Sequence, residues 1–255
     1  MKAPAALKSY VKSVVMRAGE TKSKTAMEEN VELFHNGLCI SGDITKTMTA
    51  AAVKEMVDLS TEPPIWAVHP NMVSVPIGSA DGQRIGNKIF AKNLNIRLWI
   101  SNKNDRPNVM YRIMVIRGNK NDMAHGVRPS AIWSAAPTGA PYFWDSDGAI
   151  ANNMLRDINS GRYHKVYEKL IQPFGGDYSL EGSLVPVDNW KEHSRLVNIN
   201  VKLNKVITFD EADQQYPTGD NVYSLFIITY DAFGTLKSDN VASCSFRTNL
   251  TYTDN

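Results

Sequence analysis

The sequence predicts an all-β fold, a single jelly-roll sandwich of about eight antiparallel strands with long loops. Two segments carry this prediction. In residues 94–100 apolar side chains alternate with polar ones, which is typical of a strand with one buried face. Residues 109–117 are apolar on nearly both faces, as expected for a strand deep inside a sandwich. The turn-forming residues 101–107 join these two predicted strands. In the rest of the chain, few segments have the spacing of apolar residues that is typical of a helix.

Size and composition are consistent with one globular domain. The chain has 255 residues, and no Ser, Gly or Pro-rich linker divides it. Its two cysteines, Cys39 and Cys244, are too few and too far apart to predict a disulfide framework or a zinc site. No run of about 20 apolar residues predicts a membrane span, and the N-terminus has no secretory signal pattern.

Residues 1–26 form a predicted basic arm ahead of a jelly-roll domain at 27–255. Six basic residues there oppose only Glu20, giving the arm a net charge of +5. Apolar residues between Leu7 and Ala18 recur at helical spacing, so the sequence predicts a short helix that ends near Gly19. Two interpretations stay open for the arm: contact with nucleic-acid phosphates, or a solvated terminus.

The remaining elements follow from local pattern. Residues 31–40 and 65–77 are short apolar strands, the second interrupted by Pro70 and Pro76, which favours an edge position. Between them, 47–60 is rich in alanine and predicts a short helix that covers one end of the β body. Weak alternation predicts a strand at 163–170. Clear alternation predicts three closing strands, at 195–209, 222–233 and 242–252.

Two long loops, 118–150 and 172–193, carry many aromatic side chains. Loops of this length are uncommon in a compact domain and are usually functional. Their aromatic side chains pack either on their own sandwich or on a neighbouring subunit, and the sequence does not decide between these. The candidate subunit-interface residues are Trp133, Tyr142, Phe143, Trp144, Phe174, Tyr178 and Trp190.

No catalytic or metal-binding motif is present, so the sequence predicts a protein that is not an enzyme and needs no cofactor. It contains no phosphate-binding glycine loop, nucleophile elbow or paired-histidine zinc motif. The five histidines lack ligand spacing. The acidic segment 210–220 is interpreted as a solvated hairpin tip, with a cation site between subunits as the alternative.

Four segments together resemble the capsid proteins of small circular single-stranded-DNA viruses, the circovirus-like group. They are QRIGNKI at 83–89 followed by two core strands, GRYHKVYEKLI at 161–171, NVYSLFIITYDAFG at 221–234 and FRTNLTYTDN at 246–255. The resemblance covers roughly residues 80–255. One departure is the arm, which has a single arginine and no arginine-rich block.

The resemblance implies a coat protein that assembles with identical copies, typically sixty, into an icosahedral shell around single-stranded DNA. It implies a location in the virion and allows the host nucleus. A carbohydrate-binding β-sandwich module remains the alternative. By position, the resemblance assigns DNA contacts to Lys2, Lys8, Lys12, Arg17, Lys22 and Lys24 of the arm, and to Arg84, Lys88, Lys92, Arg97 and Arg112 of the body.

Overall fold

The computed structural model describes residues 19–36, 39–40, 67–69, 71–103, 106, 108–118, 144, 152–161, 163–172, 194–209, 217, 221–231 and 239–254. These residues form two sheets of antiparallel strands and contain no helix. The first sheet contains, in spatial order, β2 (Cys39–Ile40), β1 (Thr21–Phe34), β9 (Asn240–Asp254), β4 (Lys88–Asn102) and β7 (Ser194–Thr208). The second contains β3 (Ala67–His69), β8 (Tyr223–Asp231), β5 (Val109–Gly118) and β6 (Tyr163–Ile171).

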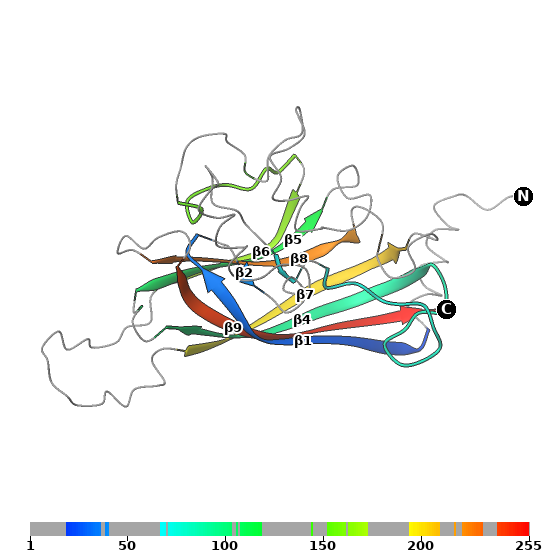
Figure 1. Cartoon of the computed structure of the whole chain (residues 1–255). Coiled ribbons are helices and arrows are strands. Elements are labelled where there is room, and N and C mark those ends of the chain that lie inside the picture. Colours follow the sequence, from blue (N-terminus) through cyan, green and yellow to red (C-terminus); the bar gives the residue numbers. More distant parts are fainter. Residues whose placement is uncertain are drawn as a thin grey trace, which may run out of the picture.

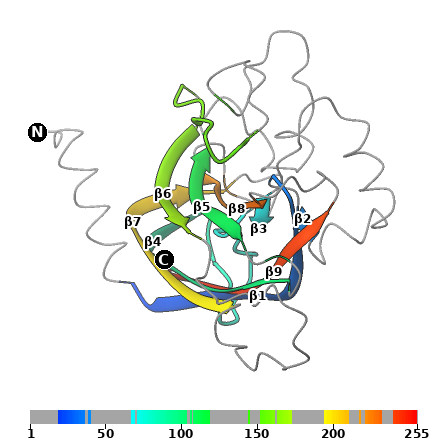
Figure 2. The same ribbon diagram turned by 90° about the vertical axis from the view of Figure 1, so that its left-hand side faces the viewer.

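The strand order confirms the predicted jelly roll. Without the two-residue β2, eight strands remain, and in chain order the first sheet runs first, eighth, third, sixth. The second sheet runs second, seventh, fourth, fifth. This interleaving of two antiparallel sheets by two Greek keys is the jelly-roll topology. Figure 1 shows the two sheets as layers, and Figure 2 shows them from the side, with strands of both around a common interior.

The main core lies between the two sheets and follows the alternation in the sequence. On β4 the side chains of Leu94, Ile96 and Leu98 are fully buried, while Asn95 and Arg97 between them are exposed. The inward residues of β7 and β9 repeat this pattern. One-sided burial is therefore the physical cause of the period of two in these three strands.

The central strands of the second sheet, β5 and β8, are buried on both faces. β5 and β8 have almost no exposed residue, because a second apolar cluster covers the side turned away from the main core. Trp144, Met154 and Tyr163 contribute to this cluster and pack with Met114 and Phe226 of the sheet. The prediction that residues 109–117 form a doubly buried strand is confirmed.

The structure differs from the sequence prediction at the N-terminal boundary. β1 begins at Thr21 and pairs with β9 from Thr21 to Phe34, so the expected boundary after residue 26 falls within a strand. Residues 21–30 show no apolar alternation because their inward positions include the polar Lys22, Lys24 and Glu28. Pairing with the strongly patterned β9 determines their conformation. Residues 1–18, including the predicted helix, lie outside the described residues, as does the predicted helix at 47–60.

Other expected strands are shorter than predicted. In 65–77 the described strand is only Ala67–His69, with an isolated bridge at Ile77. The segment 31–40 is divided between the end of β1 and the short β2. Among the described residues, no helix is long and apolar enough to cross a membrane.

Candidate nucleic-acid interface

The outer side of the first sheet is exposed along β4, β7 and β9. We call the outer side of β4, β7 and β9 the basic face. Its exposed residues are Lys88, Asn95, Arg97, Trp99, Leu196, Asn198, Asn200, Lys202 and Arg247. Successive residues of a strand point to opposite faces, and each of these residues is next in sequence to a residue of the core. Their side chains therefore point outward.

The charge of the three strands is almost entirely positive. Together β4, β7 and β9 contain seven lysine and arginine residues and one acidic residue, Asp254. The Asp254 carboxylate does not weaken the basic face, because it is buried and engaged elsewhere. It forms an ion pair with Lys22 at 3.3 Å and accepts a hydrogen bond from the backbone N–H of Ile85 at 2.8 Å.

The basic face contains a shallow depression of about 470 Å³ where the three strands run side by side. Side chains of Asn95, Arg97, Asn198, Asn200, Arg247 and Asn249 line it. The sheet register explains this gathering, since Asn95 is paired with Asn200 on one side and Asn249 on the other. Amide and guanidinium groups converge here on one hollow, and no carboxylate is among the described residues that line it.

Arg97 and Arg247 are the centre of this arrangement. They are directly opposite each other on the neighbouring strands β4 and β9, and both are exposed. Within the described residues neither guanidinium has an ion pair or a hydrogen-bond partner. Like charges directly opposite on neighbouring strands destabilise a sheet. An anion that bridges the two guanidinium groups would remove this repulsion.

Trp99 lies two residues after Arg97 on β4, so its side chain is on the same face. Its side chain is 50% exposed, and its neighbour across β7, Leu196, is 53% exposed. Its neighbour across β9 is the small residue Ser245. The depression is therefore flanked by a large aromatic surface that the subunit leaves half open to solvent.

Three of the body residues predicted to bind DNA belong to this sheet. Lys88 and Arg97 are exposed on the basic face. Lys92 lies at the irregularity between Ala91 and Asn93, and its Nζ donates a hydrogen bond to Thr21 Oγ1 at 2.8 Å. The fold therefore brings these three predicted residues onto one sheet.

Arg84, a predicted DNA contact, is instead a buried structural residue. Its side chain has no solvent exposure, and Nε donates a hydrogen bond to the carbonyl of Val75 at 3.0 Å. Nη1 donates to the carbonyl of Gly86, and the guanidinium lies 4.1 Å from the ring centroid of Phe209. Burial lowers the pKa of Arg84. A side chain enclosed in this way cannot reach a phosphate on the surface.

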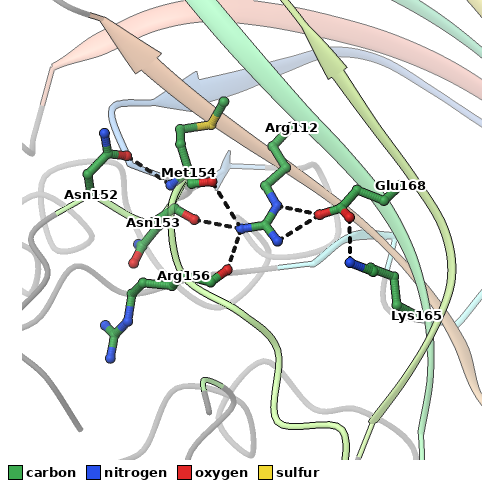
Figure 3. Close-up of polar contacts among 7 residues, drawn as sticks. All are labelled: Arg112, Asn152, Asn153, Met154, Arg156, Lys165 and Glu168. Carbon is green, nitrogen blue, oxygen red and sulfur yellow. Dashed lines mark hydrogen bonds and ion pairs between the residues drawn. The ribbon is translucent and has the colours of Figure 1, made fainter. Parts of the chain in front are cut away.

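Arg112 is also buried, and Figure 3 shows its partners. Nε and Nη2 both contact Glu168 Oε1 of the neighbouring strand β6 at 2.7 Å. Nη1 donates to three backbone carbonyls, those of Asn153, Met154 and Arg156, at 3.0, 3.3 and 2.5 Å. Arg112 therefore joins the segment 152–157 to the outside of the second sheet, a structural role in place of the predicted DNA contact.

The structure covers only the end of the predicted basic arm. Lys22 is held by the ion pair with Asp254, with a side-chain exposure of 10%. Lys24 lies two residues further along β1, on the same side of the strand. Lys2, Lys8, Lys12 and Arg17 lie outside the described residues, so their predicted DNA contacts stay predictions.

Of the aromatic residues predicted at subunit contacts, the described residues include only Trp144. Its side chain is 5% exposed and belongs to the apolar cluster over the second sheet. Arg112 and Arg156 lie 5.8 and 5.5 Å from its ring centroid. Trp144 thus packs on its own sandwich, and the interface role predicted for it is withdrawn. The remaining predicted contacts, Trp133, Tyr142, Phe143, Phe174, Tyr178 and Trp190, are outside the described residues, as are the acidic residues Asp210, Glu211, Asp213 and Asp220 of the segment 210–220.

Sequence reasoning missed Arg247 and the asparagines of the depression. Their signal was present: each occupies an outward position in an alternating strand. What the sequence did not supply was the order of strands, because β4 and β9 are far apart in the chain and adjacent in the sheet. Within the described residues, no group of His, Cys, Asp or Glu could hold a metal ion.

Comparison with known proteins adds little to this description. No protein family and no curated protein matches the sequence. Among solved structures, the chain is similar to VP1 in the pentamer of human polyomavirus 6, with 8% identity over 92% of this chain and 94% of that chain and a TM-score of 0.24. VP1 of the trichodysplasia spinulosa-associated polyomavirus has 11% identity over 92% and 76% of the two chains and a TM-score of 0.11. At such TM-scores neither similarity carries an argument, and the fold assignment depends on the strand order.

Proposed function

We propose that this chain is the capsid protein of a small single-stranded-DNA virus, which assembles with identical copies into an icosahedral shell of sixty subunits. The observation that carries the proposal is the basic face: three adjacent strands of a jelly-roll sheet, β9, β4 and β7, with exposed cations and no outward carboxylate. The four-segment resemblance to circovirus-like coat proteins supports the same conclusion. The protein is located in the virion and acts without catalysis.

In this function the basic face is turned toward the genome. Binding of phosphates by lysine and arginine releases counterions, which drives association without reading the sequence. This counterion release would come from the basic residues of the arm and from the exposed cations of the basic face, Lys88, Arg97, Lys202 and Arg247. The sheet provides a rigid surface, and the arm extends its reach.

Assembly itself depends on subunit contacts, which a closed shell repeats by symmetry. The aromatic loop residues outside the described structure remain the proposed contacts. Host-cell attachment would fall to surfaces other than the basic face, since that face is enclosed in a closed shell.

The direct test is to purify the full chain and examine it by size-exclusion chromatography and negative-stain electron microscopy. Closed particles of uniform diameter that retain nuclease-protected nucleic acid are expected. A stable monomer without such particles, under all conditions of salt and pH tried, would refute the proposal.

A deletion separates the arm from the shell. Removal of residues 1–18 leaves β1 intact, whereas a deletion through residue 26 would also remove the Lys22–Asp254 ion pair and the start of the sheet. The shorter deletion is expected to form shells with less nucleic acid. The matched control is the full chain with the four cations of the deleted segment, Lys2, Lys8, Lys12 and Arg17, replaced by glutamine.

A second candidate function is carbohydrate binding, which one observation favours. Amide side chains around the depression, with Trp99 at its edge, are groups that also bind sugars. This candidate predicts a monomer or small oligomer that binds glycans on an array and has no affinity for DNA. The particle experiment decides between the two.

A further inference from the structure

We propose that the depression on the basic face is a nucleotide pocket, in which Arg97 and Arg247 hold a phosphate while Trp99 stacks on the adjacent base. The inference rests on the proposed function and makes it more specific. The basic face would then select single-stranded nucleic acid over a duplex, beyond the general attraction of its charge.

The phosphate position follows from the two arginines. They are directly opposite on neighbouring strands and lack protein partners among the described residues. Guanidinium groups bind phosphate oxygens through two parallel N–H donors, so two of them can hold one phosphate from both sides. Binding also removes the repulsion between the two cations, which the unliganded sheet carries.

The base position follows from Trp99. Residues two apart on a strand point to the same face about 6.8 Å apart, close to the size of one nucleotide. Trp99 stands at this distance from Arg97 on β4, and Arg247 is its diagonal neighbour on β9. Its indole is half exposed, and the small Ser245 beside it leaves room over the ring. An exposed aromatic ring next to a cationic groove is the usual platform for an unstacked base.

The amide groups of the depression fit the edges of a base. Asn95, Asn198, Asn200 and Asn249 each offer both a donor and an acceptor. Such groups can satisfy the hydrogen-bonding edge of any of the four bases, so the pocket would accept any base and bind without sequence preference. This is what a protein that packages a whole genome needs.

Selection against duplex follows from the same geometry. In a duplex the bases are stacked on each other inside the helix, and only the backbone could reach the sheet. Trp99 would then contribute nothing, and binding would depend on charge alone. Trp99 therefore gives a readout that separates a nucleotide pocket from a merely basic surface.

The test is the binding of fluorescein-labelled oligo-dT, and of a labelled duplex of equal length, by the full chain, measured by fluorescence anisotropy over a range of salt. Trp99→Leu is expected to weaken oligo-dT binding by about 5-fold or more and to leave duplex binding unchanged. Trp99→Phe is expected to keep most of the affinity because it keeps an aromatic ring. If the leucine variant fails to fold, Trp99→Thr replaces it, since threonine suits a half-exposed strand position and has no ring. Oligo-U is expected to behave as oligo-dT does, because the pocket makes no contact that requires a 2′-hydroxyl.

The arginines are tested by the double variant R97Q/R247Q against the control Arg195→Gln, an exposed arginine of β7 outside the depression. The double variant is expected to reduce the magnitude of the slope of log affinity against log salt for oligo-dT by about 0.7, because the two arginines neutralise one phosphate. The control is expected to change it by less than half as much. Equal losses for oligo-dT and duplex in Trp99→Leu, or no loss at all, would overturn the inference. So would a double variant no weaker than the control.

Failure of this inference is distinguishable from failure of the proposed function. If the wild-type chain forms shells that contain nucleic acid, and the pocket variants bind oligo-dT as it does, only the pocket is refuted. If the wild-type chain forms no shells, the capsid function is refuted whatever the binding data show.

Discussion

Replacement of Arg112 by methionine tests the account of the buried polar cluster in Figure 3. The variant keeps an unbranched apolar stem and removes the guanidinium group with its charge and donors. It leaves three backbone carbonyls of the segment 152–157 without their shared donor, and it leaves the Glu168 carboxylate with Lys165 as its remaining partner. The cluster is therefore predicted to lose both an ion pair and the attachment of a loop segment.

The magnitude follows from burial. Removing one partner of a buried ion pair costs about 3–5 kcal/mol. The Arg112 side chain is 4% exposed, but that of Glu168 is 25% exposed, so solvent and Lys165 compensate part of the loss. We therefore expect the lower end of this range, a decrease of about 3 kcal/mol in the free energy of unfolding. For a chain of this size that corresponds to a fall in Tm of roughly 6–12 °C.

The assay is urea denaturation of the unassembled subunit, followed by far-UV circular dichroism. A double-mutant cycle with Glu168→Gln isolates the pair, and a coupling energy of about 1–3 kcal/mol is expected. Lys165→Gln serves as a control, because its side chain is 42% exposed and its ion pair with Glu168 should contribute well under 1 kcal/mol. A loss below about 1 kcal/mol for Arg112→Met, or a coupling energy near zero, would refute the reasoning.

Three further predictions concern Arg84, Glu168 and Cys244. Arg84→Lys should lower the free energy of unfolding by about 2–3 kcal/mol, because an ammonium cannot serve both carbonyl partners, while the nucleic acid bound per folded subunit stays unchanged. Burial raises the pKa of Glu168, but hydrogen bonds and charge from Lys165 and Arg112 outweigh burial and hold the pKa below 4.5. The full difference in free energy of unfolding between wild type and Glu168→Gln should therefore be present above pH 4.5. It should shrink as the pH falls through the lowered pKa that Glu168 has in the folded state. A difference that does not change with pH would contradict this. Burial raises the pKa of the Cys244 thiol to about 12, so in a Cys39→Ser background a disulfide reagent at pH 8 should react only after unfolding.

Alternation was the reliable part of the sequence. It located β5, β7, β8 and β9 within two residues at each end, and it located β4 although the strand begins six residues earlier than predicted, at Lys88. Burial on one or both faces leaves a direct record in the spacing of apolar side chains. Alternation failed for the first ten residues of β1. These residues are in the sheet because β9 offers them a hydrogen-bonding edge, and no local pattern records the presence of a distant partner.

Charge in the sequence was a weaker guide to the site. Arg84 and Arg112 are predicted DNA contacts, yet both are buried. An arginine can be buried when carbonyls, a carboxylate or an aromatic ring satisfy its guanidinium, and these partners come from segments distant in sequence. Lys22 is a similar case, since its ion-pair partner Asp254 lies at the other end of the chain.

The sequence by itself determined the all-β class, the identity of the core strands and which of their residues point outward, since each of these depends on the period of the chain alone. Only the tertiary structure decided which outward residues become neighbours. Arg97 and Arg247 are separated by most of the domain in sequence and are paired in the sheet because β9 returns between β1 and β4. Strand order is a property of long-range pairing, and it is this pairing that turns separate outward cations into one surface.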